Sequence, residues 1–218
     1  MKKINFTNEQ IQDMAQLYQK EGLSLKKIGE KYNVSRSVIT RVLKENNIAI
    51  RTDNHIYKAD YRKFQYIDSP EKAYWLGFIA ADGCVYEREN NASIIINLHR
   101  DDREHLEKFK RFMNSNVNIV DHIQTNNTLM SKITYNSKEM AHDLISKNIT
   151  PRKSLTLLPP NIEDKYSLAF ILGYFDGDGS IFKTSQYNNY GINIEGTAEL
   201  LTWINNKLNI SNKCISFR

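Results

Sequence analysis

An eleven-residue stretch that occurs twice constrains this chain more than any other feature. Residues 169–179 read AFILGYFDGDG, and residues 73–83 read AYWLGFIAADG. Aligned without a gap, the copies are identical at five of eleven positions, and the same offset of 96 residues aligns Ile96-Asn97-Leu98 with Ile192-Asn193-Ile194. An internal repeat on this scale indicates two copies of one structural unit.

Each copy begins as an apolar helix and ends in Asp-Gly. We expect the glycine to end the helix, because glycine enters the left-handed conformation without a Cβ penalty. An acid just before it is unfavourable by roughly 0.3–1 kcal/mol, since a helix C-terminus carries partial negative charge. A single such acid would be interpreted as solvated. Two at equivalent helix ends, Asp82 and Asp178, favour a pair that binds a hard divalent cation.

Small residues predict that the two helices pack closely. Gly77 and Ala81 lie four residues apart, as do Gly173 and Gly177, so each pair occupies one helix face. Such faces allow two helix backbones to approach closely. Packed side by side in parallel, the helices would bring the two acids to one edge of their interface.

The stretches WLGFIAADG and ILGYFDGDG resemble the two signature motifs of the LAGLIDADG homing endonucleases in their single-chain form, over roughly residues 70–218. The first copy departs from the signature, because Ala80 replaces its first acid. Asp176 holds that position in the second copy, and we expect it to be structural. The resemblance implies that the last acid of each motif, Asp82 and Asp178, is catalytic and binds Mg²⁺ or another divalent cation such as Mn²⁺.

The resemblance also implies a basic residue near the scissile phosphates. Residues 148–154, NITPRKS, follow the last helix of the first repeat. Lys153 is the candidate catalytic residue there, with Arg152 as the alternative. An ordinary linker lysine is the competing interpretation.

The resemblance implies an α+β fold of αββαββα repeats with saddle-shaped antiparallel sheets. The order of elements after Ser69 agrees, since the pattern reads helix, two strands, helix, two strands, helix. We predict a first repeat over residues 69–160 and a second over 161–218. We expect the second repeat to be incomplete, because the alignment places Arg218 opposite about Ile123 of the first. We therefore expect a less stable second repeat, with an exposed edge strand at Lys213–Phe217, and a possible need for a second protein chain to complete it.

The strands after each motif predict a DNA-contacting face. Strand side chains alternate between faces, so counting in twos from the acids also selects Cys84 and Phe182. If the resemblance holds, this face lies over a DNA major groove; otherwise it is a solvated strand face. The candidate DNA-binding residues on it are Tyr86, Arg88, Asn90, Ser180, Thr184 and Gln186.

Residues 1–50 predict a helix-turn-helix DNA-binding domain. Three helical patterns cover residues 8–21, 25–32 and 36–46; Asn33 suits a left-handed turn, and Ser35 is a good N-cap. Residues 1–69 contain 13 Lys/Arg and 8 Asp/Glu, whereas residues 70–218 contain 17 of each, so the whole charge of +5 lies in the N-terminal third. This asymmetry favours DNA binding over an ordinary solvated helix face. The outward residues of the third helix are Arg36, Ser37, Thr40, Arg41 and Lys44.

Residues 51–68 form a connector in which basic and aromatic side chains alternate irregularly. Two interpretations remain open: an arm that follows a DNA backbone, with Arg51 as a contact, or a linker whose aromatic residues dock on the next domain.

Composition excludes several classes of protein. No run approaches the roughly 18 apolar residues of a membrane span, and no apolar stretch follows the two N-terminal lysines, so we expect neither a membrane segment nor a signal peptide. Cys84 and Cys214 lack metal-ligand spacing, which indicates reduced thiols and a cytoplasmic protein.

Three functions remain after these exclusions. The first is a site-specific endonuclease in which divalent ions held by the two acids make double-strand breaks in a long, asymmetric DNA target. The second is a catalytically impaired DNA-binding relative that acts as a repressor or an intron-splicing helper. The third, a helix-turn-helix regulator with an unrelated sensor domain, leaves the duplicated acidic motif unexplained.

Overall fold

The computed structural model describes residues 4, 6–50, 57–183 and 189–209. The chain consists of two compact units, residues 1–57 and residues 58–218. Among the described residues, every helix is too short or too polar to cross a lipid bilayer.

The N-terminal unit consists of α1 (Asn8–Gln19), α2 (Leu25–Lys31) and α3 (Arg36–Glu45) around an apolar core that includes Met14, Ile28, Ile39 and Leu43. As predicted, Asn33 is left-handed, with φ of 51°.

The turn between α2 and α3 requires a glycine at position 29, and its Ser35 does not cap α3 in the way that was predicted. A Cβ on Gly29 would lie 2.6 Å from the carbonyl oxygen of Val34, so a larger residue would push the turn away from α2. Ser35 occupies the N-cap of α3, but its hydroxyl makes no capping hydrogen bond. It lies 2.8 Å from the hydroxyl of Ser37 instead, which means that the expected side-chain cap is absent.

The second unit begins with the first repeat. Its elements are α4 (Pro70–Asp82), β1 (Gly83–Glu87), β2 (Ala92–His99), the short η1 (Arg100–Asp102), α5 (Arg103–Phe112), β3 (Val120–Ile123), β4 (Leu129–Asn136) and α6 (Lys138–Ser146). After the 3-10 turns η2 (Lys153–Leu155) and η3 (Asp164–Tyr166), the second repeat supplies α7 (Ser167–Asp178), β5 (Gly179–Lys183), β6 (Tyr190–Ile194) and α8 (Ala198–Leu208). The fold class is therefore α+β, with the helix and strand order predicted for the first repeat.

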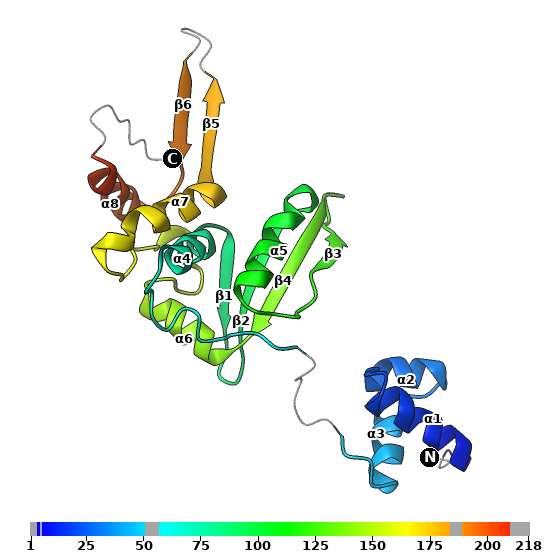
Figure 1. Cartoon of the computed structure of the whole chain (residues 1–218). Helices are drawn as coiled ribbons and strands as arrows, with labels where there is room; N and C mark the ends of the chain where they lie inside the picture. The colour runs from blue at the N-terminus through cyan, green and yellow to red at the C-terminus, as the bar shows by residue number, and fades with distance from the viewer. Residues whose placement is uncertain (1–3, 5, 51–56, 184–188, 210–218) are drawn as a thin grey trace. The chain divides into compact units, whose positions relative to one another are not determined.

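The first sheet is antiparallel in the order β1-β2-β4-β3. Along β2, buried Ile94 and Ile96 alternate with partly exposed Ile95 and Asn97, which gives the sheet one packed face and one open face. Helices α5 and α6 pack against this sheet (Figure 1). The open face is therefore the side available to a ligand.

Helices α4 and α7 pack in parallel through their small residues (Figure 1). A Cβ on Gly77 would lie 2.0 Å from the carbonyl oxygen of Phe170, and a Cβ on Gly173 would lie 1.9 Å from that of Tyr74. These contacts are equivalent under the 96-residue offset, so the helices are related by a local pseudo-twofold axis. The sequence prediction of close packing is confirmed.

The reason predicted for the glycine at each motif end was wrong. Gly83 (φ −80°, ψ 147°) and Gly179 (φ −99°, ψ 159°) are extended and begin β1 and β5. Each is required for space: a Cβ would lie 2.6 Å from the carbonyl oxygen of Ile79 at Gly83, and 2.4 Å from that of Phe175 at Gly179. The chain therefore turns directly from helix to strand, which fixes the strand relative to the preceding acid.

The second repeat, as described, has a smaller sheet than the first. Strands β5 and β6 pair antiparallel as a two-stranded hairpin. Ile181, Tyr190 and Ile192 are 64%, 73% and 69% exposed, whereas their counterparts 96 residues earlier, Val85, Ile94 and Ile96, are at most 3% exposed. The predicted strand at Lys213–Phe217 lies outside the described residues.

The connector contacts the second unit from residue 58 onward. Phe64 is fully buried in its core, Ile67 is 7% exposed, and the amide of Asp60 donates to the carbonyl of Met113. Aromatic docking therefore describes residues 58–68, while Arg51 lies outside the described residues.

Candidate functional site

The two motif acids lie beside each other where α4 and α7 end. Ala81 and Gly177 meet at the pseudo-twofold axis, since a Cβ on Gly177 would lie 2.4 Å from that of Ala81 and 3.0 Å from Asp82 Oδ2. Asp178 follows directly and faces Asp82 closely enough that each carboxylate belongs to one local electrostatic site. A larger residue at position 177 would push the acids apart.

Both acids are held where negative charge is unfavourable. Burial and, to a smaller extent, the neighbouring Asp178 raise the pKa of Asp82 to about 6, although Lys153 opposes both effects. Burial likewise raises the pKa of Asp178, while Tyr174 and Lys153 lower it. Two half-buried carboxylates with one nearby cation form a site that an additional positive charge would stabilise.

Lys153 is the cation that the structure brings to this site. Its side chain is 8% exposed and its Nζ donates to the carbonyl of Ala81 at 3.0 Å. Burial lowers the pKa of Lys153, while Asp178, Cys84 and Asp82 raise it. Arg152, the alternative, is exposed and left-handed, with φ of 58°. The left-handed residue turns the chain so that Lys153, and not Arg152, points toward the acids.

The donor set suits a hard divalent ion. Carboxylate oxygens at Asp82 and Asp178 are the ligand type that Mg²⁺ prefers, and this ion is usually bound through one or two carboxylates completed by water and phosphate oxygens. Within the described residues, no group of three or more His, Cys, Asp or Glu side chains gathers as a metal site. The chemistry therefore fits a cation shared with a phosphate better than a cation enclosed by protein ligands.

The predicted DNA-contacting residues of the first repeat follow the acid on the open sheet face. Cys84 and Tyr86 are exposed on β1, and the guanidinium of Arg88 lies 5.1 Å from the centre of the Tyr86 ring. Arg88 and Asn90 lie beyond β1, in the turn closed by the hydrogen bond from the Arg88 amide to the Asn91 carbonyl. Tyr86 therefore lies on the open strand face, whereas Arg88 and Asn90 lie in the turn beyond the strand, and their contact with DNA stays a prediction.

The open face includes residues that the sequence prediction missed. Register pairs Asn97 with Lys132 and Ile95 with Thr134, on the same side as Cys84 and its partner Ile95. Asn97 Oδ1 is buried without a hydrogen-bond partner in the structure. Alternation around the buried Ile94 and Ile96 could have indicated this side of β2. The residues of β4 could not be found in this way, because no local sequence motif determines the register in which β4 pairs with β2.

The remaining candidates are divided between the second hairpin and the N-terminal unit. Ser180 is exposed on β5, whereas Thr184 and Gln186 lie outside the described residues. On α3, Arg36, Ser37 and Lys44 are exposed. Thr40 donates to the Arg36 carbonyl at 2.9 Å, and Arg41 lies 3.9 Å from Glu45. The structure does not place α3 relative to the acids, because the two units are separate.

Comparison with known proteins gives the following similarities. Residues 69–155 match the family model of the LAGLIDADG-like domain. The homing endonuclease I-WcaI bound to its DNA recognition sequence is similar in structure, with 10% identity, 77% of this chain and 78% of that chain covered, and a TM-score of 0.48. The N-terminal LAGLIDADG domain of DUF199/WhiA gives 19% identity, 72% and 77% coverage, and a TM-score of 0.42. Meganuclease I-SmaMI bound to uncleavable DNA is 14% identical, with 57% of this chain and 64% of that chain covered and a TM-score of 0.35. No curated protein matches in sequence.

The family model covers the first motif helix, the four-stranded sheet and the segment that carries Lys153. The second motif helix α7 packs on α4 as the internal repeat requires. Residues 69–155 of this chain are therefore identified as a LAGLIDADG-like domain.

Proposed function

We propose that this protein is a site-specific DNA endonuclease that makes divalent-metal-dependent double-strand breaks in a long, asymmetric target. The observation that carries the proposal is the meeting of Asp82 and Asp178 at the α4–α7 axis, with Lys153 beside them. A purely structural interface would not require two half-buried acids at adjoining helix ends, where burial and helix dipoles both disfavour them.

In the proposed reaction, different residues would bind the metal, stabilise the phosphate charge and bind the DNA. Asp82 and Asp178 would hold Mg²⁺ or Mn²⁺, and a bound ion polarises the phosphodiester and favours formation of the attacking hydroxide. Lys153 would place positive charge beside the same phosphates. The open face of the first sheet would bind the major groove through Tyr86 and Lys132 and orient the scissile bonds. Because the acids are related by a pseudo-twofold axis, each would serve one DNA strand.

The N-terminal unit would add affinity, since α3 presents Arg36 and Lys44 to solvent. Basic side chains on one helix suit phosphate and base contacts in a major groove. In this proposal both units bind DNA, and the cut is made by the LAGLIDADG unit.

A nicking assay on random-sequence plasmid DNA tests the proposal. Wild type should nick plasmid when Mg²⁺ or Mn²⁺ is added and not in EDTA. Asp178→Asn and Asp82→Asn should retain DNA binding and lose double-strand cleavage, because asparagine keeps the shape and removes the charge. Equal nicking by wild type and both variants would contradict the assignment.

A second candidate function is DNA binding without cleavage, as a repressor or an intron-splicing helper. The observation that favours it is the exposed apolar surface of β5 and β6 within the described residues, around Ile181 and Ile192. A second protein chain that covers this surface could be needed for activity. DNA binding by wild type without metal-dependent nicking, in the presence and absence of candidate partner chains, would support this alternative.

A further inference from the structure

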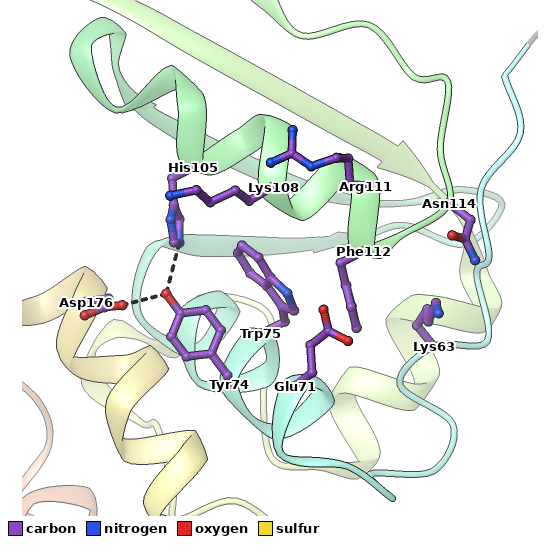
Figure 2. Close-up of a pocket in the computed structure, with 10 residues that line it drawn as sticks. All are labelled: Lys63, Glu71, Tyr74, Trp75, His105, Lys108, Arg111, Phe112, Asn114 and Asp176. Atoms are coloured by element: carbon purple, nitrogen blue, oxygen red, sulfur yellow. Dashed lines mark hydrogen bonds between the residues drawn. The ribbon is translucent and has the colours of Figure 1, made fainter.

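A chain of hydrogen bonds connects side chains of α4, α5 and α7. The Tyr74 hydroxyl of α4 donates to Asp176 Oδ2 of α7 at 2.5 Å, and it lies 3.3 Å from His105 Nε2 of α5 (Figure 2). The three side chains line a surface depression of about 740 Å³. The first repeat, through Tyr74 and His105, thereby holds a residue of the second repeat.

The direction of each bond follows from the available protons. Tyr74 has one hydroxyl proton, and the carboxylate of Asp176 can only accept it. His105 must then donate its Nε2–H to the Tyr74 oxygen. The His105 ring packs against Phe78, with centroids 4.3 Å apart, which keeps the imidazole beside Tyr74. Tyr74 is therefore held from both sides.

The pseudo-twofold axis provides an internal comparison. The counterparts of Tyr74 and Asp176 are Phe170 and Ala80, which are both 1% exposed. Positions that carry a hydrogen-bonded pair on one side of the axis therefore carry two buried apolar residues on the other. Close packing of α4 on α7 does not itself require the polar pair, so its presence calls for another explanation.

The position of Asp176 supplies that explanation. It lies in the last turn of α7, two residues before Asp178. Helix ends fray, and the strand that follows, β5, belongs only to a two-stranded sheet in the described structure. The last turn of α4 is held by Lys153 at the Ala81 carbonyl and leads into the four-stranded sheet. At the end of α7, the Asp178 carbonyl accepts from the amide of Glu195, which directly follows β6 of the two-stranded sheet.

We propose that Tyr74 and Asp176 are positioning residues for Asp178: their hydrogen bond fixes the last turn of α7 so that Asp178 faces Asp82. This inference rests on the proposed function, in which the two acids hold a divalent ion. It assigns a role to Asp176 that its counterpart Ala80 cannot perform.

The test measures Mn²⁺ affinity by electron paramagnetic resonance of the free ion, with the full chain and a short duplex of random sequence. Tyr74→Phe should weaken Mn²⁺ binding roughly tenfold, the effect typical of removing an outer partner of a metal ligand. DNA affinity should not change, and in cleavage the loss should appear in kcat, not in KM. Tyr66→Phe is the matched control, because Tyr66 is 69% exposed and its ring lies in the same unit.

A double variant separates positioning from stability. Tyr74→Phe with Asp176→Ala reproduces the apolar pair already present at Phe170 and Ala80. Thermal stability should return toward wild type while Mn²⁺ affinity stays weak, whereas Asp176→Asn, which still accepts the Tyr74 proton, should bind Mn²⁺ nearly as wild type does. Recovery of Mn²⁺ affinity in the double variant would show a packing role only and overturn the proposal.

The outcomes distinguish this inference from the proposed function. If wild type binds Mn²⁺ through Asp178 and Tyr74→Phe binds it equally tightly, the positioning role is overturned and the endonuclease proposal stands. If Tyr74→Phe weakens Mn²⁺ binding but wild type cleaves no DNA, the positioning role is supported and the endonuclease proposal fails.

Discussion

Asp82 shows at the scale of one residue what the site requires. Burial and the nearby Asp178 raise its pKa to about 6, so ionisation of Asp82 costs more free energy in the folded, metal-free protein than in water. An ordinary buried acid would be replaced or neutralised by a protein partner. Lys153 neutralises only part of the charge of the two acids. The remaining unfavourable charge is what a divalent ion would remove.

We predict that Asp82→Asn stabilises the metal-free second unit above pH ~6 by about 1–2 kcal/mol, a figure reduced for partial exposure. The sign follows from the raised pKa: the folded state favours the protonated acid, so this contribution is complete below the unfolded pKa of about 4 and is lost as pH rises through about 6. The stabilisation by asparagine should therefore disappear in acid.

Urea unfolding in EDTA measures this effect. Both tryptophans, Trp75 and Trp203, lie in the second unit, so their fluorescence reports on it alone. A variant less stable than wild type at pH ~8, or an equal stabilisation at pH ~8 and pH ~4, would contradict the electrostatic account of Asp82.

At the scale of elements, the α4–α7 pair depends on its glycines. We predict that Gly173→Ala destabilises the second unit by roughly 3 kcal/mol, at the upper end for overpacking, because the methyl group would meet backbone atoms of Tyr74 that cannot move aside. Gly191→Ala is the control, since its methyl group would meet only the ring of the half-exposed Phe182. Equal unfolding midpoints for the two variants would exclude the close approach.

The helices and strands could be predicted well from the sequence, whereas the way in which they pack against each other could be predicted only in part. Apolar periodicity and turn residues gave the helices and the first two hairpins, and duplication gave the α4–α7 pair. The rotation of α7 that brings Asp176 to Tyr74 depends on packing of distant segments, which leaves no local pattern. For the same reason the sequence could not show that Gly83 is extended, or that Lys153 is more buried than Arg152.

The second hairpin, β5 and β6, gains less stability from buried apolar side chains than the first hairpin does. Each exposed Ile or Leu forfeits roughly 1.5–3 kcal/mol of burial, and Ile192 is 69% exposed where Ile96 is fully buried. We predict faster amide hydrogen exchange in β6 and α8 than in β2 and α5 of the isolated protein. Equal protection of the two sets would show that the hairpin is covered or stabilised in another way.

At the scale of the whole molecule, the proposed function assigns the cut to the second unit and part of the DNA affinity to the N-terminal unit. The excess of positive charge lies before residue 70, while both acids lie after it. We predict that Arg41→Gln with Lys44→Gln weakens DNA binding and reduces the slope of log K against log salt by about 1–2, because up to two fewer counterions are released.

The residual cleavage pattern of this double variant should be unchanged, because neither residue belongs to the second unit. Glu45→Gln is the control: it removes the partner of Arg41 on α3 and leaves both basic side chains. A salt slope equal to that of wild type in the double variant would remove α3 from the DNA interface.

Strand-specific mapping of DNA ends most directly tests the claim that Asp82 and Asp178 form one metal-dependent cleavage site with a role on each strand. A randomised duplex library would be incubated with Mg²⁺ and wild type, Asp82→Asn or Asp178→Asn, and the new ends sequenced on both strands. The account predicts recurrent paired ends within one asymmetric sequence for wild type. It predicts loss of paired ends, with the sequence still bound, for both variants. Paired ends that persist in either variant, or wild-type ends that appear equally in EDTA, would contradict it.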